Sequence, residues 1–262
     1  MEIRQGGVVS HLLADVAIPR MFRAEQVFPR EHIAPGEIPS VVERELFREP
    51  FRSKIRPGMT VAVTAGSRGI ANVDIITRAV VDFVKARGAA PFIVPAMGSH
   101  GGATAEGQLE VLASYGITPD TMGCEIRSSM EVVELGVSST GMPVYLDKNA
   151  YGADGIILSC RLKPHNAFRG PYESGPCKMM TVGLGKQKGA ERVHADGMDK
   201  IGENIPSMAK VVLEKAPILF ALPCIENAYD QTWRIEAIDK DHILAREPEL
   251  LREAFARMPS LL

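Results

Sequence analysis

Three of the six histidines lie in segments whose glycines and prolines mark loops beside apolar runs. His100 stands in "MGSHGGAT" after the run "PFIVPA", His165 stands in "RLKPHNAFRG" after "GIILSC", and His194 ends "GLGKQKGAERVH". Imidazole takes up and releases protons near neutral pH, and it is also the commonest ligand of borderline metals. The three histidines therefore predict a site for proton transfer, for metal binding, or for both.

A lysine lies between the second and the third of these histidines. The segment "GPYESGPCKMMTVGLG" holds Lys178 near its middle, and its glycines, among them Gly175 and Gly183, would let a bulky cofactor approach the backbone. A lysine in such a place is a plain charge, a phosphate contact or a covalent attachment point. The residues alone leave these three roles open.

The residues before and after these loops predict alternating strands and helices. The runs at 60–67 and 91–96 are short and apolar, and the segments at 73–88 and 104–116 have the spacing of helices with one apolar face. This alternation is typical of a parallel sheet covered by helices. Parallel strands end at a common edge, where open α/β sheets bind ligands, so the loops after the strands are expected to share one site.

The remainder of the chain is predicted to continue the same domain. Further elements are expected at 130–147 (a β-hairpin), 154–160 (a strand), 201–216 (a helix), 217–226 and 232–239 (strands) and 246–258 (a helix). Residues 1–58 are irregular and proline-punctuated, and no repeat or linker divides the chain. We therefore predict one α/β domain over residues 1–262, with a mostly parallel, Rossmann-like sheet flanked by helices. The apolar ending "MPSLL" fits either a docked final helix or a cut at a domain boundary.

The composition is that of an ordinary globular protein. It bears on which classes of partner the protein binds and on the cellular compartment in which it works. Of 262 residues, 45% are hydrophobic and 24% are charged, and 30 basic against 32 acidic residues give a net charge of −2. There is no basic excess for nucleic acid, no signal-peptide core and no apolar run long enough to span a membrane. The four cysteines lack CxxC pairing and are expected to be reduced. The sequence thus predicts a cytoplasmic protein that binds neither nucleic acid nor membrane.

The stretch "VTAGSRGIAN" superficially resembles the glycine-rich first turn of an NAD-dependent short-chain dehydrogenase. Ala65 and Ala71 replace two of the expected glycines, and no tyrosine is followed four residues later by the lysine that these enzymes need. NAD binding is therefore the least favoured interpretation. The loop still follows a strand, and Arg68 within it is a candidate for holding a carboxylate or another anion.

The order of these motifs resembles the N-terminal domain of the nickel-pincer-dependent lactate racemase family, over about residues 55–200. The resemblance implies that Lys178 carries a covalently bound nickel-pincer nucleotide, with Gly175 and Gly183 beside it, and that His194 binds its nickel. It further implies that His100 and His165 are the acid/base pair and that Arg68 binds the substrate carboxylate. The implied reaction is racemisation or epimerisation of a small 2-hydroxy acid through its 2-keto form.

The chain also departs from the family pattern. Ala65 stands where the family usually carries an aspartate, Gly101 and Gly102 follow His100 in place of Arg-Pro, and the segment between His165 and Lys178 is longer. These changes line the expected pocket, so a larger 2-hydroxy acid or a sugar acid is expected as readily as lactate. The resemblance also implies a C-terminal domain that closes over the site. Because the chain stops near where that domain would begin, we expect little turnover from it alone.

Two other classes of function stay open. A zinc hydrolase would use His100, His165 and His194 as three ligands around a zinc-bound water, although no two of them have the spacing of a motif such as HExxH. A non-catalytic domain would keep the fold and bind a nucleotide or an acid at the strand ends. Homo-oligomers are compatible with the sequence. A chain made without the cofactor pathway is expected to be apo.

Overall fold

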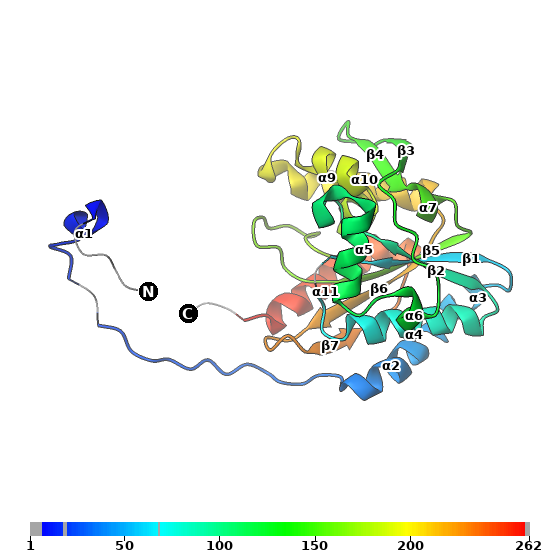
Figure 1. Ribbon diagram of the computed structural model, residues 1–262, viewed down its shortest axis with the longest axis horizontal. Coiled ribbons are helices and arrows are strands. Elements are labelled where there is room, and N and C mark those ends of the chain that lie inside the picture. Colours follow the sequence, from blue (N-terminus) through cyan, green and yellow to red (C-terminus); the bar gives the residue numbers. More distant parts are fainter. Residues whose placement is uncertain (1–6, 18–19, 68, 260–262) are drawn as a thin grey trace.

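The computed structural model describes residues 7–17, 20–67 and 69–259, and it has a mixed, mostly parallel sheet between helices (Figure 1). The strands lie in the order β2 (Ala90–Pro95), β1 (Thr60–Ala65), β5 (Gly155–Arg161), β6 (Ile218–Glu226) and β7 (Thr232–Ile235), and β8 (Ile238–Asp239) also pairs with β6. Strands β2, β1, β5 and β6 are parallel, whereas β7 and β8 run antiparallel to β6. The predicted α/β fold is confirmed.

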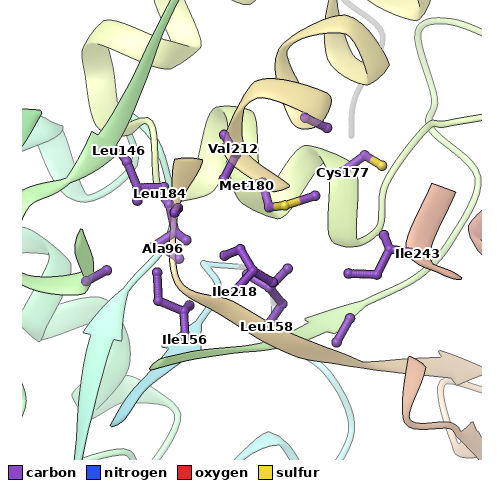
Figure 2. Packing of buried hydrophobic residues seen from close by; sticks show 14 of the residues in the cluster. Ala96, Leu146, Ile156, Leu158, Cys177, Met180, Leu184, Val212, Ile218 and Ile243 are labelled. Atoms are coloured by element: carbon purple, nitrogen blue, oxygen red, sulfur yellow. The ribbon is translucent and has the colours of Figure 1, made fainter. Parts of the chain in front are cut away.

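The central strands are buried on both faces, which explains their continuous apolar sequences. In β1, Ala62 packs into the larger core cluster, while Val61 and Val63 face the opposite cluster. In β5, Ile156 and Leu158 take the first side and Ile157 takes the second. Figure 2 shows the larger cluster, in which Ile156, Leu158 and Ile218 of the strands meet side chains of helices. Cys177, Met180 and Val212 come from helices between β5 and β6 in the sequence, and Ile243 comes from the helix after β8.

One face of the sheet is covered by helices from the first third of the chain. Helix α2 (Ile38–Leu46) packs on α4 (Val73–Ala86), and the short α3 (Phe51–Lys54) places Phe51 against Phe220 of β6. The prediction treated residues 1–58 as irregular and missed both α2 and α3. Residues 20–27 form an extended segment that leads away from the body (Figure 1). The next residues contact the body, where the N–H of Phe28 donates to the Tyr229 hydroxyl at 3.1 Å and that of Ile33 to the Thr232 carbonyl oxygen at 2.7 Å.

The opposite face carries the elements that surround the candidate site. In chain order, these and the remaining helices and turns are α1 (Val8–Leu12), η1 (Pro35–Glu37), η2 (Gly101–Ala103), α5 (Ala105–Ser114), α6 (Pro119–Met122), α7 (Lys148–Tyr151), α8 (Pro176–Lys178), the π-helical η3 (Met179–Gly183), α9 (Lys186–His194), α10 (Met198–Lys215), η4 (Lys240–His242) and α11 (Ile243–Arg257). The expected hairpin is formed by β3 (Val132–Val137) and β4 (Pro143–Asp147) as a separate two-stranded sheet. Helices α10 and α11 begin three residues earlier than predicted, and the helical segment from α8 to α9 was not predicted.

The strands bring their carboxyl ends to one edge of the sheet. Ala65 at the end of β1 pairs with Pro95 at the end of β2, and β5 runs parallel beside β1 up to Arg161. The chain then enters the loops that carry His100 and His165, as the prediction required. No helix among the residues that the structure describes is long and apolar enough to cross a membrane.

Candidate active site

A cavity of about 330 Å³ opens at this edge of the sheet, between the loops after β1, β2 and β5 and the segment from α8 to α9. His100, His165, Lys178 and His194, which are far apart in the sequence, all line it. The two predicted cofactor glycines, Gly175 and Gly183, line it as well. Arg68 lies outside the described residues, although its neighbours Gly66 and Ser67 belong to the cavity wall.

His100 follows β2 in a loop built largely of glycine. Its Nδ1 is hydrogen-bonded to the hydroxyl of Ser67, which comes from the loop after β1. Gly101 has a φ of +66°, and a Cβ there would lie 2.6 Å from the backbone of Gly107 in α5. A glycine is therefore required at this position by the close approach of the loop to α5.

A buried polar network supports the His100 loop from below. The Gln108 amide donates to the carbonyl oxygens of Gly98 at 2.9 Å and His100 at 3.3 Å. Its own oxygen accepts at 3.0 Å from the fully buried Lys186, whose Nζ lies 3.2 Å from Asp147 Oδ2. Burial lowers the pKa of Lys186 and raises that of Asp147. The network links the start of α9 to the loop that carries His100.

The loop of His165 is held by a buried carboxylate. Glu173, only 1% exposed, accepts the backbone N–H of His165 at 2.5 Å and that of Gly170 at 3.1 Å. The His165 ring stacks obliquely on Phe168, and its Nδ1 accepts the N–H of Ala167 at 3.1 Å. Because Nδ1 is an acceptor, the neutral ring carries its proton on Nε2.

His194 is the last residue of α9 and has the opposite tautomer. Its Nδ1 donates to the carbonyl oxygen of Ala190, one helical turn earlier, at 2.6 Å. The neutral ring then has its lone pair on Nε2. A ring N–H fixed by a backbone carbonyl is the arrangement found for histidines that bind metals through the other nitrogen.

Lys178 is the last residue of α8 and leads into the π-helical η3. Its Nζ lies 6.0 Å from the centre of the Phe168 ring. Single π-helical turns occur frequently at functional sites. A Cβ at Gly183 would lie 2.8 Å from the Ala96 carbonyl oxygen, so this glycine lets η3 press against the end of β2.

A buried carboxyl group from α11 anchors the start of the Lys178 segment. Glu247 is 1% exposed, and its Oε2 accepts the backbone N–H of Cys177 at 2.8 Å. A Cβ at Gly175 would lie 2.6 Å from Glu247 Oε1, so any larger residue there would have to displace the Glu247 side chain. Burial raises the pKa of Glu247 to about 7.

Sequence reasoning missed six polar residues of the cavity wall, namely Ser67, Ser99, Arg161, Lys163, Asn166 and Ser174. Ser67 contacts His100, Arg161 ends β5, and Lys163 follows two residues later. The available signal for Arg161, Lys163 and Asn166 was their position directly after a predicted strand, in the same stretch as His165. No side-chain spacing marked them.

The three histidines do not assemble a zinc centre. In the described parts of the chain, no group of three or more His, Cys, Asp or Glu side chains is placed to hold a metal ion. The wall of the cavity instead offers one imidazole nitrogen, on His194, whose tautomer suits a metal ligand. The three-histidine hydrolase interpretation therefore lacks the ligand set that it requires.

Comparisons with known proteins agree with the motif order. The sequence model described as the lactate racemase N-terminal domain matches residues 8–204. The solved structure of the lactate racemase apoprotein from Thermoanaerobacterium thermosaccharolyticum superposes with a TM-score of 0.61 at 14% identity, covering 81% of this chain and 54% of that one. This similarity shows that the two chains share a fold. The present chain spans about half the length of the solved structure. No curated protein matches the sequence.

Proposed function

The chain belongs to the lactate racemase N-terminal domain family, and from this premise we propose that it serves a racemase or epimerase of a 2-hydroxy acid that uses a nickel-pincer nucleotide. The observation that carries the proposal is the convergence of Lys178, His194, His100 and His165 on one cavity. These are four of the five side chains for which the family resemblance implies a chemical role, and the fifth, Arg68, lies outside the described residues.

The residues present fit the cofactor. Lys178 lies on the wall and offers an amine for covalent attachment, and His194 offers Nε2 as a nickel ligand. Gly175 and Gly183 expose backbone to the same cavity. When bound, the group would supply an acceptor for the hydride on C2 of the substrate.

The two other histidines would handle the hydroxyl proton of the substrate. Racemisation needs a group that accepts this proton in one enantiomer and a group that returns it in the other. His165 holds its proton on Nε2 and is prepared to donate. His100 is hydrogen-bonded through Nδ1 to the hydroxyl of Ser67, which can donate or accept. His100 can therefore act as the acid in one direction of the reaction and as the base in the other.

The substrate and the rest of the enzyme follow from the same proposal. We infer that residues 1–262 act as the N-terminal domain of a two-domain enzyme in the cytoplasm, and that a second domain closes the cavity and excludes water. The substrate is a 2-hydroxy acid whose carboxylate binds Arg68. A larger 2-hydroxy acid is proposed as readily as lactate. Of the positions that depart from the family pattern, Ala65, Gly101 and Gly102 are not among the described lining residues, whereas the longer segment before Lys178 contributes Asn166, Ser174 and Gly175.

Turnover tests the proposal. The chain is co-produced with the enzymes that synthesise the pincer cofactor and is incubated with single enantiomers of 2-hydroxy acids, and the products are separated by chiral chromatography. We expect the opposite enantiomer to form, slowly with the chain alone because no second domain closes the cavity, to be lost in His100→Ala and to be retained in His242→Ala, which changes an exposed histidine. Equal turnover by His100→Ala would contradict the acid/base assignment. A loaded chain with no turnover on any acid, even when the C-terminal domain of a lactate racemase is supplied, would favour a binding role.

A further inference from the structure

The wall of the cavity is cationic beyond what the proposed chemistry uses. Arg161, Lys163 and Lys178 line it, and no aspartate or glutamate is found among its described lining residues. Lys178 is assigned to cofactor attachment, and Arg68 to one substrate carboxylate. Arg161 and Lys163 therefore have no role in the mechanism above.

Arg161 is held rigidly at the end of β5. Its guanidinium pairs through Nη2 with Glu226, which is 2% exposed, while Asp230 is a distant and largely exposed neighbour at 3.7 Å. Glu226 also accepts the backbone N–H of Ala71 at 2.6 Å. Glu226 is not part of the cavity wall, so it holds the arginine from behind.

The Arg161 side chain is itself only 16% exposed, and its Nε is buried without a hydrogen-bond partner in the described structure. A charged donor that is buried and incompletely bonded is costly unless a ligand or another group completes its contacts. Lys163 lies two residues further on, with its backbone N–H bonded to Ser174 at 2.9 Å. Its position is thereby fixed at the same wall.

We propose that Arg161 and Lys163 form a subsite for a second anionic oxygen group of the bound molecules, separate from Arg68. A fixed guanidinium beside an ammonium suits a carboxylate or a phosphate. Two sources offer this chemistry: a second carboxylate on a dicarboxylic 2-hydroxy acid, and the phosphate of the nucleotide cofactor. The inference rests on the proposed function for the identity of these molecules.

Binding to the cofactor-free chain tests the first source. Calorimetric titration compares malate, which has two carboxylates, with lactate, which has one. Because the second carboxylate would form a hydrogen-bonded ion pair with the subsite, malate should bind about ten-fold or more tightly than lactate. Lys163→Gln should remove this preference. The double variant Arg161→Gln/Glu226→Gln should remove it without leaving a lone buried carboxylate. Lys188→Gln, at an exposed position on α9, should retain it.

Loading tests the second source. Intact mass of each variant, co-produced with the pincer-synthesis enzymes, reports the fraction modified. If the Lys163→Gln chain folds, keeps the malate and lactate affinities of the wild type and loses modification, the cofactor phosphate occupies the subsite. If modification persists and the malate preference disappears, the substrate carboxylate occupies it.

The proposal is overturned if both variants match the wild type in modification and in malate preference. The subsite and the proposed function can fail separately. If the chain never accepts the cofactor but prefers malate in a way that depends on Lys163, the subsite is supported and the racemase function is contradicted. Thermal unfolding of each variant shows whether it is folded, and Lys163→Gln, a change at a half-buried position of the cavity wall, remains informative if the double variant is unstable.

Discussion

The Nδ1 of His194 lies 2.6 Å from the carbonyl oxygen of Ala190, within the last turn of α9. This hydrogen bond sets the tautomer of the neutral ring and leaves Nε2 with a lone pair, as a metal ligand requires. His165 shows the opposite arrangement, because its Nδ1 accepts a backbone N–H. Two histidines of one cavity are therefore prepared for different chemistry by their backbone contacts.

The first prediction concerns His194. His194→Ala should remove nickel from the loaded chain, because the imidazole that we propose as its ligand is gone, while the mass gain at Lys178 persists. Elemental analysis and intact mass on the same sample separate the two effects. His242→Ala is the matched control and should leave both unchanged. Full nickel content in His194→Ala would show that another residue binds the metal.

The second prediction concerns Glu173, which accepts two backbone N–H groups around the His165 loop. In Glu173→Gln the amide oxygen satisfies one of them, and the amide nitrogen faces the other. An unsatisfied buried donor costs about 1–3 kcal/mol of unfolding free energy. Urea unfolding measures this loss, and kcat of the loaded chain should fall because His165 is displaced. Unchanged stability would show that the loop does not depend on this carboxylate.

The third prediction concerns Glu247, whose pKa is raised by burial from its ordinary 4.5 to about 7. Between these values the folded chain holds the proton and the unfolded chain has lost it, so stability falls as pH rises through this window. The loss is on the order of 3 kcal/mol and levels off above the upper value. Urea unfolding across the window should show this decline in the wild type and in Glu249→Gln, an exposed position of α11. Glu247→Gln should lack this decline. If stability falls with pH equally in Glu247→Gln and in the wild type, the raised pKa of Glu247 is not its cause.

The fourth prediction concerns the network below His100. Lys186→Met leaves Asp147, Gln108 and the Pro95 carbonyl without their shared donor. Removing one partner of a buried ion pair costs roughly 3–5 kcal/mol. Unfolding by urea measures it, and Lys186→Met/Asp147→Asn should recover part of the loss because no charge is then left alone. If Lys186→Met is as stable as the wild type, the network does not contribute to the stability of the fold.

The central sheet and the positions of His100 and His165 were predictable because short apolar runs alternate with amphipathic helical spacing. The loops after parallel strands then had to meet at one edge. Local composition was sufficient here, since each strand is buried on both faces and shows it in its residues.

The segment from α8 to α9 was not predictable from the same signals. It is rich in glycine, which disfavours helix, yet close packing requires these glycines: a Cβ at Gly189 would lie 2.5 Å from the Thr181 carbonyl oxygen. Lys186 stands in the polar run "GLGKQKGAE", where a lysine is typically exposed, but it is buried beside Asp147, which ends a hairpin strand far away in the sequence. Such pairings depend on tertiary contacts that residue patterns do not encode.

The most direct test of the central claim is the mass and metal content of the chain co-produced with the pincer-synthesis enzymes. Peptide mapping after intact mass measurement should place one modification on Lys178, with about one nickel per modified chain, and Lys178→Arg should abolish both while Lys188→Arg keeps them. A chain that stays unmodified and free of nickel, under conditions that load a known lactate racemase, would contradict the account.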